Sequence, residues 1–384
     1  CAWVYTLYRL DRKQAATRLR QHKRWYIIGG ILGGILLLGG SASLYTLKKD
    51  SADGRFLMWK ITTKAIQKQP ITGTSLGGFP AAYAETQAEY MASGKATEQE
   101  KLVAGCPEYA FNEYLQIGLE QGLVGLALFI GWLGLLFYKG IKNKRYACCG
   151  GLMSLAIFAF SSYPLQLPEF WVVLIFLGVM SVTPDKDEIR ENQAESNGHR
   201  WGKQIFFMGI AILGIGLFWM QKDHYKAYQQ WNKAQMFYNN KAYEAALEVY
   251  EPLYPLLKHK PEFLFEAAQS LSKTGQYEKA NEYLERAVLL SSDPMLYYVM
   301  AKNEQCLGEY RQAEKHLLHA IDILPERIYP YYLLMNLYTE PSYFQPAKLK
   351  MAIDSVLTKK PKVESSAIKE MKEKARSMLN NTSI

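Results

Sequence analysis

The sequence contains little that supports a metal site or a disulfide framework. Its 384 residues include five cysteines and six histidines. Cys148 and Cys149 are adjacent within an apolar run, whereas Cys1, Cys106 and Cys306 are isolated from one another. No CxxC…CxxC spacing is present, so the cysteines predict neither a zinc site nor a set of disulfides. The cysteines therefore indicate no metal site, and no residue pattern in the sequence predicts a cofactor.

Two further absences argue against nucleic acid and nucleotides as partners. The formal net charge is +9, but the basic residues form short clusters at the ends of apolar runs, a pattern typical of membrane topology rather than of a DNA-binding face. The glycine-rich stretch Gly73–Phe79 lacks the Gly-Lys-Ser/Thr ending and the preceding strand of a phosphate-binding loop. We expect no nucleic acid and no nucleotide at this stretch.

Long apolar runs dominate the chain up to about Met220, and a polar, tyrosine-rich sequence follows. This division predicts a membrane domain over residues 1–220 and a soluble domain over residues 221–384. Cys1–Leu10 resembles the end of an apolar segment, so we expect the membrane domain to be incomplete at its N-terminus. The predicted fold class is all-α: a polytopic helical membrane domain followed by a soluble helical solenoid.

Basic clusters and apolar runs together predict the topology. The cluster in Asp11–Arg24 predicts a cytoplasmic loop. The polar segment, residues 48–121, and everything after Met220 then lie on the opposite side, which in a bacterium is the periplasm. Two of the apolar runs flank Pro164 and could form a re-entrant hairpin instead of crossing, without changing this result. The apolar runs predicted as membrane segments, several of them shorter than twenty residues, are Tyr26–Leu47, Leu123–Tyr138, Tyr146–Tyr163, Phe170–Val182 and Ile205–Met220.

The soluble part repeats itself with a period of about 33–34 residues. Tyr243, Tyr277 and Tyr310 each begin a Tyr-x-x-Ala unit, and glycine stands two residues before the second and third of them. This pattern resembles the tetratricopeptide repeat, a helix–turn–helix unit. We predict two clear repeats, a degenerate repeat at each end, and a charged helix within Lys359–Ile384 that caps the stack. The resemblance implies a protein or peptide partner.

Three residues of the repeats could suggest a metal site. Lys315, His316 and His319 lie at helical spacing. A solvent-exposed helix face explains this spacing better than metal binding does.

The start of the polar segment is strongly basic. From Lys48 to Lys68 it holds six basic residues and two acidic ones. We predict a helix over Gly54–Lys68 that is capped by Asp53 and ended by Pro70. A basic helix beside a membrane suits anionic lipid headgroups or a phosphate-bearing substrate.

Individual basic side chains of this helix differ in what they can bind. Lys60 and Lys64 belong to a row that recurs every four residues, and we assign them to substrate or headgroup phosphates. Arg55 stands apart, because a guanidinium can bind a diphosphate through paired hydrogen bonds.

Several short motifs occur in an order that resembles the bacterial O-antigen ligase superfamily, which includes O-antigen polymerase-like enzymes and protein O-oligosaccharyltransferases. The resemblance covers about residues 26–182. The motifs are Gly54-Arg55 with Trp59, Gly73–Phe79, Asn112–Gln116, Glu120–Gly125 and Ser161–Leu165.

The resemblance implies a multi-pass transferase of the bacterial inner membrane that acts in lipopolysaccharide biosynthesis without metal. Such an enzyme moves a glycan from an undecaprenyl-diphosphate carrier to an acceptor hydroxyl, for example on the lipid A core. Arg55 matches the phosphate-binding arginine of the family. The alternatives are a polysaccharide polymerase or a protein O-oligosaccharyltransferase on the same carrier, or a non-catalytic membrane scaffold that recruits envelope proteins through its repeats.

The chain departs from the family where a general base is usually sought. Many members carry His-Asn where this chain has Phe111-Asn112, and the polar segment contains no histidine. Glu113 or Glu108 could replace the histidine, and we favour Glu113 as the catalytic carboxylate. Asn112 and Gln116 are one helical turn apart and are expected to orient substrate hydroxyls.

Overall fold

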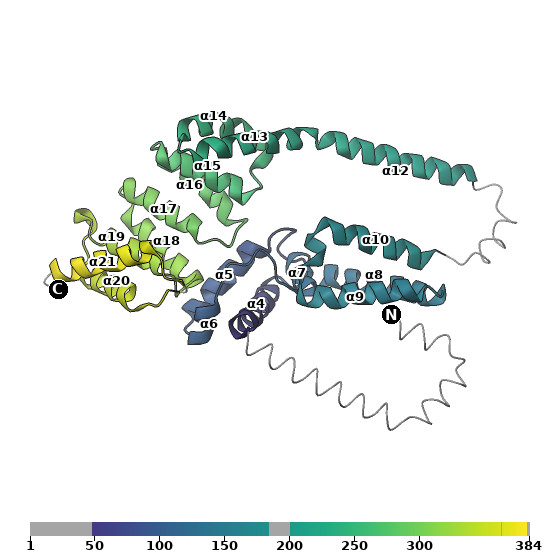
Figure 1. Ribbon diagram of the computed structural model, residues 1–384, viewed down its shortest axis with the longest axis horizontal. Helices are drawn as coiled ribbons and strands as arrows, with labels where there is room; N and C mark the ends of the chain where they lie inside the picture. Colours follow the sequence, from purple (N-terminus) through teal and green to yellow (C-terminus); the bar gives the residue numbers. More distant parts are fainter. Residues whose placement is uncertain (1–47, 184–199, 362, 382–384) are drawn as a thin grey trace, which may run out of the picture. The chain divides into compact units, whose positions relative to one another are not determined.

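The computed structural model describes residues 48–183, 200–361 and 363–381, which fold into helices without a β-strand among them (Figure 1). For residues 200–206 it describes the backbone alone. The predicted cytoplasmic loop Asp11–Arg24 and the predicted span Tyr26–Leu47 lie outside the described residues. The all-α class is confirmed for the described chain.

Contacts divide the chain into two units. The apolar unit comprises Cys1–Thr74 and Tyr109–Trp201, and the repeat unit comprises Ser75–Glu108 and Gly202–Ile384. This division differs from the predicted boundary after residue 220. It also divides the polar segment, because its middle part, the insertion Ser75–Glu108, packs within the repeat unit.

Helix α4 (Lys49–Lys68) opens the described part of the apolar unit. It begins earlier than predicted, so Asp53 lies inside the helix and the prediction that it caps the N-terminus was wrong. The N-cap position is Lys48, whose side chain makes no capping hydrogen bond. The helix ends two residues before Pro70, as predicted, because proline disfavours helical geometry in the residue that precedes it.

The rest of the apolar unit is a small helical bundle. Pro164 and Pro168 begin its last two elements, where a proline costs no helical hydrogen bond. Leu152 and Leu174 are almost fully buried between helices. The elements are α7 (Glu113–Glu120), α8 (Gly122–Lys142), α9 (Tyr146–Ser161), the 3-10 turn η1 (Pro164–Gln166) and α10 (Pro168–Val182).

The bundle exposes many apolar side chains. Leu128 on α8, Ile157 on α9 and Phe176 on α10 are each more than half exposed. Within the part of the chain that the structure describes, one helix, α8, is long and apolar enough to cross a membrane, while α9 and α10 are apolar but shorter.

The repeat unit begins with α12 (Arg200–Met220), which includes the run predicted to cross the membrane last. Its side chains from Phe207 to Met220 are all exposed. Four antiparallel helix pairs and a final helix follow in the described chain: α13 (Lys222–Asn239) with α14 (Tyr243–Leu257), α15 (Pro261–Lys273) with α16 (Tyr277–Val288), α17 (Met295–Cys306) with α18 (Tyr310–Ile323), α19 (Ile328–Leu337) with α20 (Pro346–Thr358), and α21 (Ser366–Asn381).

The packing of the pairs follows from the repeated sequence pattern. Ala246, Ala280 and Ala313 are fully buried where two helices cross, because a methyl group allows the backbones to approach. Gly275 and Gly308 adopt φ values of +82° and +79° at the turns inside their pairs, where a side chain would be strained. The predicted repeats, their degenerate ends and the terminal helix are therefore confirmed in outline.

The insertion forms α5 (Phe79–Ala92) and α6 (Glu98–Val103). Its central contact is Gln87, which is fully buried and whose Nε2 donates to the carbonyl of Ile323 at 2.9 Å and to that of Gly105 at 3.0 Å. Tyr83 in turn donates to Gln87 Oε1 at 2.7 Å. These bonds fix the insertion on the C-terminal end of α18.

The histidines of α18 contribute to this packing. His319 lies 3.5 Å from Glu85 of the insertion, and His316 lies 2.9 Å from Glu304 on α17. Tyr297 packs its ring against both imidazoles. Lys315 is exposed, as predicted, but the two histidines lie in a contact surface between α18, α17 and the insertion.

Candidate functional site

The candidate site is the surroundings of Arg55 on α4. The side chain is exposed, and its Nη1 donates to the backbone carbonyl of Ser161 at 3.0 Å. Its guanidinium carbon lies 5.2 Å from the ring centroid of Phe111, within the range of a cation–π contact. One hydrogen bond and one ring contact thus orient this exposed guanidinium.

Aromatic rings surround this arginine. Phe111 packs edge-on against Tyr163 at 4.8 Å, and Tyr109 stacks on the same tyrosine at 5.2 Å. Trp59 donates from Nε1 to the carbonyl of Ala110 at 3.1 Å and packs edge-on against Phe160. These contacts tie α4 to residues 109–111 and to the end of α9.

Phe111 itself is strained. Its φ of +50° lies in the left-handed region, which costs a residue with a side chain about 1–2 kcal/mol. Strain of this kind persists where neighbouring groups hold the conformation, and it concentrates at functional sites. Here Arg55 and Tyr163 hold the ring in place.

Asn112 and Gln116 lie beside the site but point into the protein. Asn112 is the N-cap of α7, and its Oδ1 accepts from the Leu115 amide at 3.1 Å. Gln116 accepts from the Ala110 amide at 2.8 Å and donates to Glu120 at 2.9 Å. Both side chains are buried, so their bonds shape the loop that carries Phe111.

Glu113 is also buried, with 1% of its surface exposed. Its Oε1 accepts from the Leu165 amide at 2.7 Å, and its Oε2 accepts from Gln166 Nε2 at 3.2 Å. Burial raises the pKa of Glu113, although these two hydrogen bonds act to lower it. The carboxylate therefore anchors turn η1, which follows directly after Tyr163.

Lys60 and Lys64 do not join Arg55. Both are exposed on α4. Because an α-helix turns by about 100° per residue, they lie about 140° and 180° around the helix from Arg55. A single small ligand cannot contact all three side chains.

The glycine-rich stretch has a structural role at its first glycine. Gly73 has a φ of +69°, and a Cβ on it would lie 2.5 Å from backbone atoms of Glu120 and Gly122. The neighbouring amide of Thr74 donates to the carbonyl of Leu119 at 2.9 Å. Gly73 thus allows the backbone to lie close to the junction of α7 and α8, whereas Gly77 has open space around it.

Sequence reasoning identified Arg55, Glu113 and the Ser161–Leu165 motif, and the structure brings all three together. It did not single out Tyr109 or Phe160. For Tyr109, the aromatic residues at positions 109 and 111, directly before Asn112, could have indicated an aromatic cluster at this site. Among the described residues, no group of three or more His, Cys, Asp or Glu side chains is arranged to hold a metal ion.

Comparisons with known proteins give two family matches. Residues 1–130 match the family described as O-antigen ligase, and residues 239–320 match the family described as anaphase-promoting complex, cyclosome, subunit 3. A comparison with curated proteins finds no match.

Solved structures resemble the chain at low sequence identity. MamA is 17% identical over 40% of this chain and 88% of its own, with a TM-score of 0.33. A kinesin light chain of Podosopora anserina with nearly identical TPR-like repeats is 17% identical over 41% of this chain and 88% of its own, also with a TM-score of 0.33. The type III secretion chaperone SycD of Yersinia enterocolitica, solved with a peptide of the translocator YopD, is 16% identical over 39% of this chain and 92% of its own, with a TM-score of 0.25.

The family match supports a glycosyltransferase-like role in polysaccharide biosynthesis. It includes Arg55, Phe111 and Glu113 but ends before Ser161. Residues 1–130 of this chain belong to an O-antigen ligase domain, and the helix pairs of its C-terminal part are tetratricopeptide-like repeats.

Proposed function

We propose that the protein transfers a glycan from an undecaprenyl-diphosphate carrier to an acceptor hydroxyl, with Arg55 binding the diphosphate. The observation that carries this proposal is the exposed, oriented guanidinium of Arg55 within the ligase domain. A guanidinium held on one edge by Ser161 and Phe111 retains N–H groups that can bind two phosphate oxygens.

The reaction forms one bond and breaks another at the anomeric carbon of the donor glycan. The acceptor hydroxyl oxygen attacks this carbon, the bond to the diphosphate oxygen breaks, and the proton of the hydroxyl passes to the leaving diphosphate or to solvent. Negative charge accumulates on the leaving diphosphate, where Arg55 stabilises it more strongly than in the ground state. This requires no metal, since the cation is supplied by the protein.

Glu113 contributes by positioning. Both of its oxygens accept hydrogen bonds from turn η1, and it is shielded from solvent. It therefore holds residues 161–166 in the conformation that presents the Ser161 carbonyl to Arg55. We favour this role over that of the general base suggested by the sequence. Asn112 and Gln116 act in the same way on the loop of Phe111.

We place the apolar unit in the bacterial inner membrane, with several helices crossing it and with the Arg55 site and the repeats on the periplasmic side. The exposed apolar side chains of α8, α9 and α10 support this placement, because their contact with water would be unfavourable and lipid would cover them. We place α12 of the repeat unit, whose side chains from Phe207 to Met220 are exposed, in the membrane for the same reason. Lys60 and Lys64 then face lipid headgroups rather than the reacting diphosphate.

The test is an in vitro transfer assay with full-length protein in nanodiscs, an undecaprenyl-diphosphate glycan and a core glycolipid acceptor. Loss of an electrostatic donor at a reacting centre costs roughly 10²–10³-fold in rate, so we expect Arg55→Ala to lose that much and Arg55→Lys to recover part of it. Lys95→Ala, an exposed change in the insertion, is the charge-matched control. Full activity of Arg55→Ala would exclude the proposed role.

A further inference from the structure

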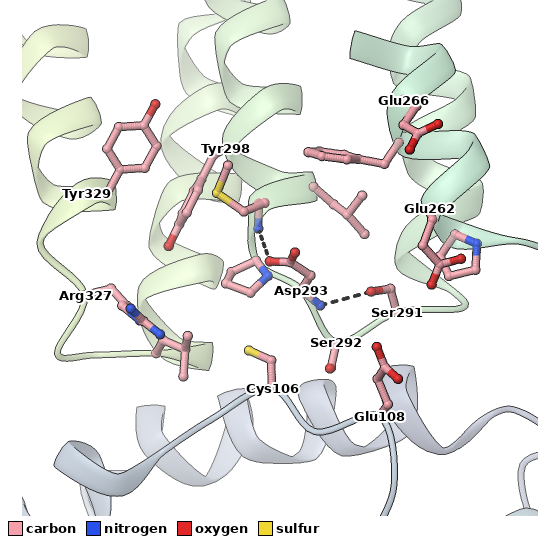
Figure 2. A pocket seen from close by; sticks show the side chains of 16 residues that line it. Cys106, Glu108, Glu262, Glu266, Ser291, Ser292, Asp293, Tyr298, Arg327 and Tyr329 are labelled. Carbon is pink, nitrogen blue, oxygen red and sulfur yellow. Dashed lines mark hydrogen bonds between the residues drawn. The ribbon is translucent and has the colours of Figure 1, made fainter. Parts of the chain in front are cut away.

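The repeat unit contains a cavity of about 900 Å³ that the proposed transfer reaction does not use (Figure 2). Its walls are the first turns of α15, α17 and α19, the loop 291–294, and residues 106–108 of the insertion. Its volume falls within the range of about 300–1,000 Å³ that is typical of ligand sites.

The wall formed by the insertion is fixed. Ser292 Oγ donates to the carbonyl of Pro107 at 3.2 Å. Gln87 holds the carbonyls of Gly105 and Ile323 with its two N–H groups. The cavity is therefore a preformed feature of the folded unit and not a gap between loosely placed segments.

The lining is acidic in a basic protein. The chain has a net charge of +9, yet the cavity is lined by four carboxylates and one guanidinium, that of Arg327. Glu266 already accepts hydrogen bonds from Trp231, Gln235 and Tyr250. The other three carboxylates, which are exposed, are those of Glu108, Glu262 and Asp293.

Tyr298 provides an independent indication of a ligand. The residue is 4% exposed, and its hydroxyl makes no hydrogen bond to any of the described residues. Figure 2 shows its oxygen directed toward the space beside Arg327 and Cys106. Burial raises the pKa of Tyr298, so the hydroxyl keeps its proton and lacks an acceptor. The hydroxyl therefore opens on the cavity, where it can donate to a ligand oxygen in place of water.

The rings of the lining complete the recognition surface. Tyr298 packs edge-on against Tyr329 at 5.2 Å, and Phe265 lines the cavity on the side of α15. Lys302 Nζ already lies 5.2 Å from the centroid of the Tyr329 ring, so the rings offer a ligand apolar contact for the aliphatic stems of lysine and arginine rather than a free cation–π face.

We propose that this cavity binds an extended, lysine- or arginine-rich segment of another polypeptide. The three exposed carboxylates pair with its cationic side chains, the rings cover the side-chain stems, and the Tyr298 hydroxyl donates to one of its backbone carbonyls. A neutral glycan would leave the negative charge of the lining uncompensated, and an anionic one would be repelled. The proposal concerns binding and does not depend on glycan transfer.

The test is fluorescence anisotropy of full-length protein in nanodiscs with a labelled nine-residue peptide that carries three lysines separated by alanine and tyrosine. We expect saturable binding that weakens with added salt, and no binding of the same peptide with glutamate in place of lysine. The triple variant Glu108→Gln, Glu262→Gln, Asp293→Asn removes three exposed ion pairs, which predicts affinity weaker by roughly tenfold or more. Tyr298→Phe, which keeps the ring, should weaken binding by roughly three- to tenfold.

The matched control is Glu278→Gln, Glu285→Gln, Glu309→Gln, which removes the same charge from exposed positions outside the cavity lining. It should bind the peptide within about twofold of the unmodified protein, since net charge alone has little effect on a specific site. Equal losses in both triple variants, or undiminished binding by the cavity variant, would overturn the proposal. Binding of a neutral oligosaccharide, together with no binding of the lysine peptide, would also overturn it.

Discussion

Replacing Glu113 distinguishes a positioning role from a catalytic one, because the two roles predict different results for alanine and glutamine. Glu113→Ala leaves the buried amide of Leu165 without its acceptor at 2.7 Å and removes the bond from Gln166. Glu113→Gln retains a carbonyl oxygen that can accept from Leu165 but cannot take up a proton from a substrate hydroxyl.

The expected magnitudes follow from the two hydrogen bonds. An unsatisfied buried amide costs about 1–3 kcal/mol, so Glu113→Ala should lower the free energy of unfolding by that amount. For a unit of this size, this corresponds to roughly 2–4 °C in the unfolding midpoint per kcal/mol. Glu113→Gln should lower the free energy of unfolding by less than about 1 kcal/mol, since the shorter hydrogen bond, from the Leu165 amide, persists.

The pKa of Glu113 adds a pH signature with a defined sign. Burial raises the pKa above its ordinary value of 4.5. The folded state therefore favours the protonated acid more than the unfolded state does, and the stability that Glu113 contributes decreases as the pH rises from 4.5 through the raised pKa. Glu113→Gln should remove this part of the pH dependence.

The assay combines thermal unfolding in detergent with transfer kinetics at matched protein concentration. If Glu113 acts by positioning, the transfer rate of Glu113→Gln stays within about tenfold of that of the unmodified protein, whereas the rate of Glu113→Ala falls further. A stably folded Glu113→Gln protein that has lost transfer as completely as Glu113→Ala would refute the reasoning, because the carboxylate itself would then be required.

Two further predictions concern stability. Gly73→Ala places a Cβ 2.5 Å from backbone atoms of Glu120 and Gly122, so steric and left-handed strain together should lower the free energy of unfolding by roughly 3 kcal/mol or more. Gly77→Ala, with a similar φ and open space around it, should lower it by about 1–2 kcal/mol. Thermal unfolding measures both losses, and equal losses would contradict the close approach at Gly73. In the repeat unit, burial acts to raise the pKa of Glu314, but hydrogen bonds from Lys348, Tyr338 and Tyr343 lower it overall. The stability that Glu314 contributes is therefore present above pH 4.5 and is lost as the pH falls through the lowered pKa. Glu314→Gln should make acid unfolding, measured by circular dichroism, less steep. An unchanged acid transition would show that these hydrogen bonds do not contribute to the pH dependence of stability.

The repeats could be predicted from sequence because each signal is local. The spacing of tyrosine, alanine and glycine within one repeat determines the crossing of two adjacent helices, and Ala280 and Gly275 occupy the positions that the pattern requires. The apolar helices α8, α9 and α10 were predictable for a similar reason, since a run of apolar residues needs no distant partner to be recognised.

The candidate site was only partly predictable. Arg55 and the Ser161–Leu165 motif were recognised from their order in the chain, and they do meet. The burial of Glu113 was not foreseen, because a carboxylate at the start of a helix usually faces water. Here its partners, Leu165 and Gln166, lie more than fifty residues further along the chain, and no local sequence pattern predicts hydrogen bonds over that separation.

The insertion was misjudged for the same physical reason. Its polar composition suggested a loop that belongs wholly with the Arg55 site. Gln87 is instead buried against Ile323, 236 residues away. The side-chain amide of Gln87 bonds two backbone carbonyls and one tyrosine hydroxyl, and these bonds hold α5 in place. The average composition of the segment does not show that one of its polar residues is buried in this way.

The chain passes out of the apolar unit and back into it at the two ends of the insertion. The chain enters the insertion from Thr74, which is bonded to Leu119, and leaves it into Tyr109, which stacks on Tyr163. Glu108, which lines the acidic cavity, is the residue directly before Tyr109. The backbone that carries Phe111, whose ring lies 5.2 Å from the guanidinium carbon of Arg55, therefore continues directly from a residue of the cavity lining. Transfer rates measured with and without the lysine peptide test whether the two sites are coupled, and equal rates would show that they act independently.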